Sequence, residues 1–99
     1  MKIELRTFGN IISDENSGDI IYSKINDILK KTDNCVVDFT GIKSMATFNA
    51  KQIFGRLYLE LGPEGFFQKI EIKNASGDLQ LIIRLGIENA LEDNEKTDI

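Results

Sequence analysis

Histidine and tryptophan are absent from the 99 residues of this chain, and cysteine and proline each occur once. Without histidine the protein lacks the commonest general base, the Ser-His and Cys-His nucleophile pairs and the imidazole ligands of metal sites. The one cysteine, Cys35, excludes an internal disulfide and a zinc-type ligand cluster. An enzyme would have to use Asp14 or Asp38 as a base and Lys43 as an electrophile, and no triad, phosphate loop or metal-ligand spacing accompanies them. We therefore expect a protein that is not an enzyme and has no catalytic residues, metal or cofactor.

Long hydrophobic runs are also missing. The longest are short stretches such as residues 81–83, far below the roughly 20 residues that a membrane-spanning helix needs. The first residues, 1–4, carry charged side chains where a signal peptide would begin its apolar core. Together with the lone cysteine, these features predict a cytoplasmic protein that does not act on a membrane.

The acidic excess of the chain is confined to its C-terminal end. Residues 1–87 hold eleven acidic and eleven basic side chains, whereas residues 88–99 hold five acidic side chains and one lysine, which accounts for the net charge of −4. We interpret residues 1–91 as a single domain and residues 92–99 as an acidic, frayed tail, with an interaction tail as the alternative. No basic stripe is present for phosphate contacts, so neither nucleic acid nor an anionic membrane is an expected partner.

The hydrophobic pattern alternates between the periods of strands and helices. Strands are predicted at residues 2–8, 35–39 and 66–73, with an extra short strand at 11–12, and helices at about 20–31, 46–61 and 79–91. The nearly continuous apolar run 35–39 is typical of a central strand covered on both faces, whereas the alternating run 69–73 indicates one solvated face. This β-α-β-α-β-α order predicts an α/β fold, a small parallel sheet with helices packed mainly on one side.

The expected helix ends carry recognisable cap residues. Ser17 or Asp19 should cap the first helix, and Thr47, with Ser44 second, should cap the middle helix, which the Gly62-Pro63 pair should end. Thr47 and Ser44 have a second interpretation as candidate phospho-acceptors. A phosphate at a helix N-terminus meets free N–H groups and the positive end of the helix dipole, and it changes the charge of the surface that a partner meets.

Polar side chains follow two of the predicted strands. Asp38 lies at the end of the buried central strand, so its carboxylate needs partners, either backbone N–H groups of the following loop or a lysine. Asn74 follows the third strand, and loops at the carboxyl ends of strands meet at one edge of such a sheet. We assign Asp38 and Asn74 as structural polar residues.

Residues 36–57 contain an Asp-Phe-x-Gly strand end that begins at Asp38, a hydroxyl-rich loop, and a helix with Phe-Gly-x-Leu from Phe54. These features resemble the central stretch of the STAS-like proteins, a bacterial family of unknown function related to anti-sigma factor antagonists. The resemblance implies a small α/β domain that works by binding proteins. In the STAS antagonists the partner is an ATPase-fold serine kinase, and phosphorylation at the start of the helix after the central strand switches that partner.

The family's usual pattern at this helix start is Asp-Ser-Ser-Gly or similar, with the second serine as the usual acceptor. When the pattern is placed through Ile53, Gly55 and Arg56, it falls on residues 46–49, and the acceptor position is occupied by Phe48. The sequence departs from the family there, which leaves Thr47 or Ser44 as the residues that can take the acceptor role.

We therefore predict a non-enzymatic protein-interaction module, regulatory in the manner of an anti-sigma factor antagonist. Its partner would be another protein, such as an ATPase-fold kinase or an anti-sigma-like factor. The predicted partner-binding residues are polar and lie at the start and on the exposed face of the middle helix: Lys43, Ser44, Thr47, Asn49, Lys51, Gln52 and Arg56.

Two other functions and two assembly states stay open. The chain could be a small-ligand, nucleotide-like sensor that uses the polar strand-end loops, or an accessory subunit of a neighbouring enzyme in a bacterial defence or mobile-element operon. The lysines of the strand 69–73 discourage edge pairing, which favours a monomer over a homodimer.

Overall fold

The computed structural model describes residues 1–97 as an α/β fold with two parallel sheets. β1 (Lys2–Glu4), β3 (Cys35–Asp38) and β5 (Ile70–Lys73) form a three-stranded sheet in the order β1-β3-β5. β2 (Ile11–Ile12) pairs with β4 (Ser44–Met45) in a second, smaller sheet. The predicted short strand at 11–12 and the central place of the second predicted strand are both confirmed.

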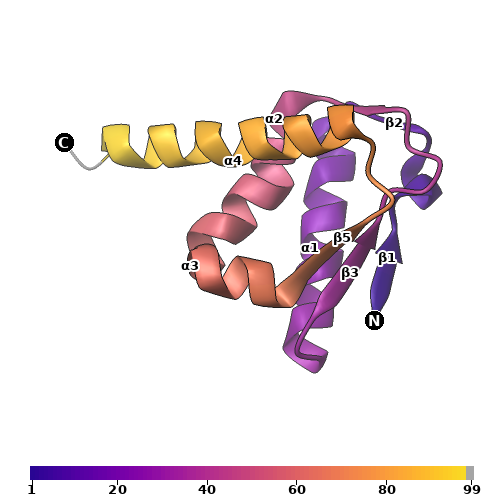
Figure 1. Cartoon of the computed structure of the whole chain (residues 1–99), viewed down its shortest axis with the longest axis horizontal. Coiled ribbons are helices and arrows are strands. Elements are labelled where there is room, and N and C mark those ends of the chain that lie inside the picture. The colour runs from indigo at the N-terminus through magenta and orange to yellow at the C-terminus, as the bar shows by residue number, and fades with distance from the viewer. Residues whose placement is uncertain (98–99) are drawn as a thin grey trace.

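The helices alternate with the strands as predicted (Figure 1). α1 (Glu15–Lys31) leads to β3, and α4 (Gly77–Thr97) ends the described chain. Between β4 and β5 lie α2 (Thr47–Ala50), a π-helical segment η2 (Lys51–Gly55) and α3 (Arg56–Lys69). The first predicted strand is shorter than expected, because a 3-10 turn η1 (Leu5–Phe8) follows β1 and is closed by a hydrogen bond from the Thr7 hydroxyl to the Glu4 carbonyl.

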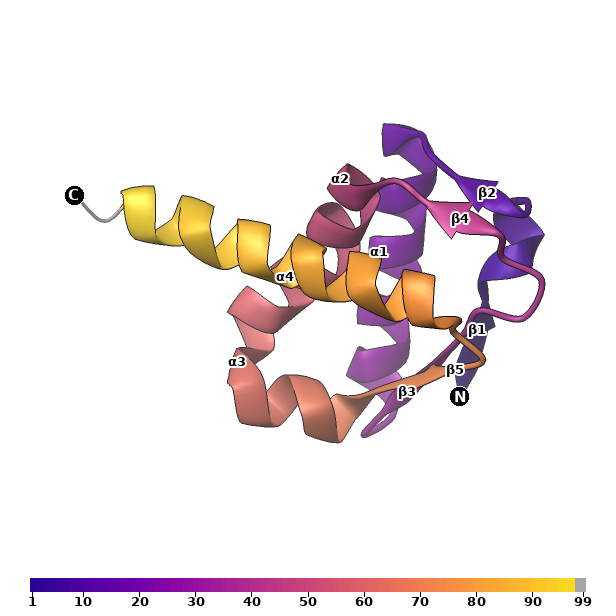
Figure 2. The same cartoon turned by 45° about the horizontal axis from the view of Figure 1, so that its top comes forward.

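The three-stranded sheet is covered on one face only. Side chains alternate along β3, so Cys35 and Val37 are buried, whereas Val36 is half-buried between Lys2 and Glu71 of the neighbouring strands. Figures 1 and 2 show the long helices to one side of this sheet. The prediction that helices pack mainly on one side is confirmed. The prediction that β3 is covered on both faces is wrong, because the continuous apolar run includes one valine on the open face.

α1 begins before its apolar pattern does. The Asp14 carboxylate accepts a hydrogen bond from the backbone N–H of Ser17 at 2.9 Å, so Asp14 is the N-cap in place of Ser17 or Asp19. That bond lowers the pKa of Asp14. The polar residues 15–18, which the sequence suggests as loop, therefore form the first turn of the helix.

The middle helix has no side-chain cap. Its N-cap is Ala46, Thr47 is the first helical residue, and Ser44 lies in β4 opposite Ile11. Both predicted caps are wrong because the backbone N–H groups of Asn49 and Ala50 already bond to the Ala46 carbonyl, and β4 takes the chain up to Met45.

α3 is two helical segments joined at Gly62, which has a φ of 76°. The predicted stop at Gly62-Pro63 is thus present, but Pro63 starts a second segment that runs to Lys69, because proline fits the first turn of a helix. Phe66 is buried in this segment against Tyr58, at 5.4 Å between ring centroids. The third strand accordingly begins at Ile70 and not at Phe66.

α4 crosses the middle helix at small residues. A Cβ atom added at Gly86 would lie 2.5 Å from backbone atoms of Ala50 and Lys51, and one at Gly55 would lie 2.7 Å from the Cβ of Ala90. The helix continues to Thr97, so the acidic segment 92–97 is helical, and residues 98–99 of the predicted tail lie outside the described residues. Within residues 1–97, no helix has the length and apolar character needed to cross a bilayer.

Candidate interaction surface at the start of the middle helix

The predicted partner-binding residues divide into exposed and buried sets. Lys43 and Ser44 are exposed before and within β4, and Thr47 is half-buried in the first turn of α2. Asn49, which the sequence places on the exposed face, is fully buried. The prediction for Asn49 is wrong because the turn on which it lies packs against the start of α1.

Asn49 and Gln52 hold the start of α1 against the middle helix. The Asn49 side-chain amide donates to the Asp14 carbonyl at 2.8 Å. The Gln52 amide donates to the Glu15 carbonyl at 2.9 Å and to the Asp19 carboxylate at 2.8 Å. Gly18 permits this approach, since a Cβ there would lie 1.8 Å from the Gln52 Oε1. The NH2 groups of both amides are therefore already used within the molecule, whereas the buried Asn49 Oδ1 has no hydrogen-bond partner among the described residues.

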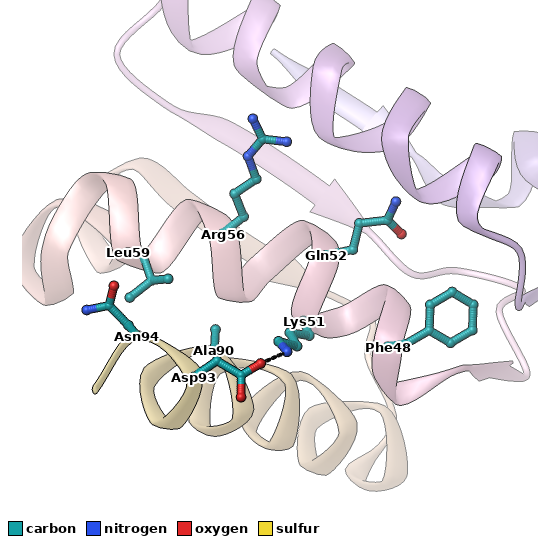
Figure 3. A pocket seen from close by; sticks show the side chains of 8 residues that line it. All are labelled: Phe48, Lys51, Gln52, Arg56, Leu59, Ala90, Asp93 and Asn94. Carbon is teal, nitrogen blue, oxygen red and sulfur yellow. Dashed lines mark hydrogen bonds and ion pairs between the residues drawn. The ribbon is translucent and has the colours of Figure 1, made fainter. Parts of the chain in front are cut away.

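Phe48 is the exposed residue that sequence reasoning did not place in the surface. Its side chain is 50% exposed, although it lies between Thr47 and the buried Asn49. Figure 3 shows it at one end of a groove of about 490 Å³ between the middle helix and α4. A signal was available, because Phe48 is out of phase with the apolar stripe of Ala50, Ile53 and Phe54.

The groove has polar walls on both helices (Figure 3). The Lys51 ammonium from η2 forms an ion pair with the Asp93 carboxylate from α4, and Leu59 and Ala90 supply apolar surface. The Lys51 ammonium thus helps to hold α4 against the middle helix. The lysine side chain is 39% exposed, so it still contributes positive charge to this side of the molecule.

Arg56 is held in one orientation at the far end of the same surface. Its guanidinium lies over the Tyr22 ring, 4.0 Å from the centroid, and its Nε is 3.8 Å from the Glu60 carboxylate. The Tyr22 hydroxyl donates to Glu60 and accepts from the Asn26 amide. Burial, with Glu60 second, raises the pKa of Tyr22, so this hydroxyl keeps its proton. The Arg56 guanidinium is therefore exposed but held in place by contacts within the chain.

Asp38 and Asn74 meet at the carboxyl ends of β3 and β5. One oxygen of the Asp38 carboxylate, Oδ1, accepts from the Thr40 hydroxyl at 2.7 Å, the Thr40 N–H at 2.9 Å and the Asn74 amide at 3.0 Å, while Lys2 lies 3.8 Å from the other. Asp38 thus has both kinds of partner that the sequence suggested. The Thr40 hydroxyl, followed by the Asn74 amide, holds the pKa of Asp38 far below its usual range. A carboxylate stabilised in this way is a poor general base.

The described residues offer no arrangement suited to a metal. Within residues 1–97, no three cysteine or acidic side chains come together as a metal-binding group. Cys35 is buried in β3, and burial raises the pKa of its thiol, which disfavours the reactive thiolate. The surface of the middle helix presents one exposed aromatic ring, the exposed apolar side chain of Leu59 and the charged groups of Lys51 and Arg56.

Comparison with known proteins gives one result. Residues 17–80 match the family model described as the STAS-like domain of unknown function (DUF4325). This segment includes α1 from Ser17 onward, the central strand, the middle helix and β5. No curated protein and no solved structure matches the chain.

Proposed function

The chain belongs to the family of STAS-like domains of unknown function, and we propose that it is a non-enzymatic protein-interaction module whose contact surface is centred on Phe48. The observation that carries the proposal is the 50% exposure of this aromatic ring at the start of the middle helix. Aromatic and arginine side chains contribute most of the binding energy in protein interfaces, and Phe48 shares its groove with Arg56 and the apolar Leu59.

The surroundings of Phe48 support a partner of defined chemistry. Lys43 and Arg56 are exposed near either end of the surface, and Leu59 adds an apolar side chain that is 41% exposed. Arg56 is fixed by Tyr22 and Glu60, so little side-chain entropy is lost when it binds. The best-fitting partner has an apolar pocket with acidic residues around it, on a protein such as an ATPase-fold kinase or an anti-sigma-like factor.

A photoreactive benzoylphenylalanine at position 48 tests this surface. In a lysate of the source organism we expect it to cross-link a protein that the same group at position 81 does not, since Leu81 is also 50% exposed but lies on α4. Lys43→Glu should remove that product because it reverses an exposed charge in the segment that leads into the middle helix. The same products from positions 48 and 81 would refute the proposed surface.

The partner-binding variants need a folding control. Phe48→Ala should reduce partner binding at least tenfold while changing the free energy of unfolding by less than about 1 kcal/mol, because the ring is half exposed. Gln52→Glu is a poor choice for this purpose, since it would disturb the bonds to Glu15 and Asp19 that hold α1. Unchanged binding by Phe48→Ala would show that the ring is not part of the interface.

Regulation by phosphorylation belongs to the same proposal. Ser44 is exposed, and Thr47 is half-buried at the first turn of α2, so Ser44 is the more accessible acceptor. A phosphate adds close to two negative charges beside Lys43 and would weaken binding to an acidic partner. Mass spectrometry of the chain isolated from cells tests this: phosphate on neither residue would remove the regulatory part and leave the contact surface intact.

The alternatives make different predictions. A nucleotide-like ligand should raise the melting temperature by mass action, and a thermal-shift panel would reveal it. The hydroxyl, amide and carboxylate groups of Thr40, Asn74 and Asp38 bond to one another, which favours the interaction module over a sensor at the strand ends. An accessory role would require a stable complex with the product of an adjacent gene.

A further inference from the structure

The outer edge of β5 is unpaired within residues 1–97 (Figure 1). The Phe39 N–H donates to the Lys73 carbonyl at 2.9 Å, so the backbone groups of Lys73 point toward β3. The Val36 N–H instead donates to the Met1 carbonyl, because the even-numbered residues of β3 bond to β1. Backbone groups alternate in direction along a strand, so the N–H and C=O of Ile72 point to the free edge. Such an edge is a template for another extended strand.

Apolar side chains lie beside this edge on the helix-covered face. A groove of about 660 Å³ between α3, β5 and α4 is lined by Tyr58, Phe66, Phe67 and Ile72, among others. Phe67 is 72% exposed, yet its ring is held edge-on to Tyr58 and Phe66, with centroids 6.3 and 5.5 Å away. An ordered, exposed aromatic ring next to an unpaired strand indicates an interface.

The charged side chains of β5 favour a second copy of the same chain as the strand that pairs with it. Glu71 and Lys73 are exposed on the open face of the sheet, and neither forms an ion pair within residues 1–97. If two copies pair antiparallel about a two-fold axis at Ile72, Glu71 of each copy lies opposite Lys73 of the other. Opposite charges directly across an antiparallel pair are stabilising, and the two-fold axis forms both pairs at once.

We propose that the chain forms a symmetric dimer in which β5 pairs antiparallel with β5 of a second copy, centred on Ile72. The two sheets then continue into one, and the two Ile72 side chains face each other below the groove. Phe67, which lies just before β5, comes beside the loop after β5 of the second copy. A register centred on Glu71 would instead set Glu71 against itself and Lys69 against Lys73, so the charges disfavour it.

This dimer is independent of the proposed partner surface, because the two share no residues. It also gives Lys73 of β5, and Lys69 at the end of α3, a role other than the one expected from sequence. They discourage pairing in the register centred on Glu71, whereas Glu71 between them permits the register centred on Ile72. The charges of β5 thus favour pairing with a second copy in one register, and they do not simply prevent edge pairing.

Sedimentation velocity of the full chain over a concentration series tests the proposal. We expect a species of twice the 11.2 kDa monomer mass. Glu71→Lys and Lys73→Glu should each weaken the dimer at least tenfold, because each single change sets like charges opposite one another. The double variant Glu71→Lys with Lys73→Glu should restore the dimer, since the pairs re-form with reversed polarity.

The control is Lys24→Glu, which makes the same charge change on the exposed face of α1 and should leave the dimer intact. Circular dichroism would confirm that each variant is folded. A wild-type chain that is monomeric at all concentrations would overturn the proposal. So would a dimer that the single variants do not weaken or that the double variant does not restore.

Discussion

At the scale of single residues, Asp38 shows how a buried carboxylate ties two parts of the fold together. It joins the end of β3 to Thr40 and to Asn74, which comes after β5 and has a positive φ of 61°. The sequence predicted that this acid needs partners, because a charge at the end of a buried strand is costly alone. It could not specify that Asn74 would be one of them, since the two residues meet only when β5 pairs with β3.

Asp38→Asn is expected to lower the melting temperature at neutral pH. The pKa of Asp38 is depressed in the folded state, so its stabilising contribution is present above the unfolded value near 3.8 and is lost as the pH falls toward the folded value. The gap in melting temperature between wild type and variant should therefore narrow below about pH 4. Calorimetry from neutral to acidic pH would measure it.

Asp33→Asn is the matched control, because Asp33 is an exposed acid in the turn before β3. Its melting temperature should follow the wild type at every pH. A gap for Asp38→Asn that stays constant into the acidic range would show that the loss arises from packing and not from the ionised carboxylate.

Asn49 and Phe48 show where residue-level prediction failed. Asn49 carries a polar amide, which the pattern of polar and apolar residues assigns to the solvent-exposed face of the helix. Asn49 is nevertheless buried because the carbonyl at the start of α1 accepts its hydrogen bond. Partners this far apart in sequence are set by tertiary packing, so the order of polar and apolar residues could not reveal them.

At the scale of elements, the close crossing of α4 over the middle helix requires a glycine at position 86. Gly86→Ala would put a Cβ 2.5 Å from backbone atoms of Ala50 and Lys51, so the helices must separate. Overpacking of this kind typically costs about 1–3 kcal/mol. We expect a loss of that size in the free energy of unfolding measured with urea.

Gly77→Ala provides the comparison on the same helix, since a Cβ there meets nothing within 4 Å. It should be neutral or slightly stabilising, because alanine reduces the entropy of the unfolded chain. Equal losses for the two variants would mean that glycine at position 86 is not needed for close helix packing.

The order of elements was predictable, but several boundaries were not. Alternating periods of two and 3.6 residues gave the three strands of the main sheet and the helices in the correct succession, whereas the two-residue strand β4 was not predicted. The start of α1 and the end of α3 were misplaced because both depend on local bonds, the cap by Asp14 and the new segment at Pro63. The interaction surface was predicted only as a region, since the exposure of Phe48 depends on how α4 and α1 flank the middle helix.

At the scale of the whole molecule, the acidic excess and the hydrophobic core occupy different parts of the chain. Residues 1–87 are neutral overall, and the net charge of −4 comes from residues 88–99, most of which lie in the last turns of α4. Figure 1 shows this end of the helix projecting beyond the rest of the fold. Ala90 is buried, whereas Leu91 and residues 92–95 are exposed. Ala90 is thus the last buried residue in the described part of α4, and the domain boundary at residue 91 stays a prediction.

Truncation after Leu91 should therefore leave a stable domain. Truncation removes the ion pair between Lys51 and Asp93, in which both side chains are partly exposed, at 39% and 54%. Surface ion pairs contribute about 0–1 kcal/mol, so the free energy of unfolding should fall by no more than about 1 kcal/mol. Urea denaturation of the full chain and of residues 1–91 would measure the difference, with Lys51→Met in the full chain as the control that removes the ion pair alone. The truncation and Lys51→Met should have similar effects, and a loss of several kcal/mol on truncation alone would mean that the acidic turns of α4 are part of the domain's cooperative structure.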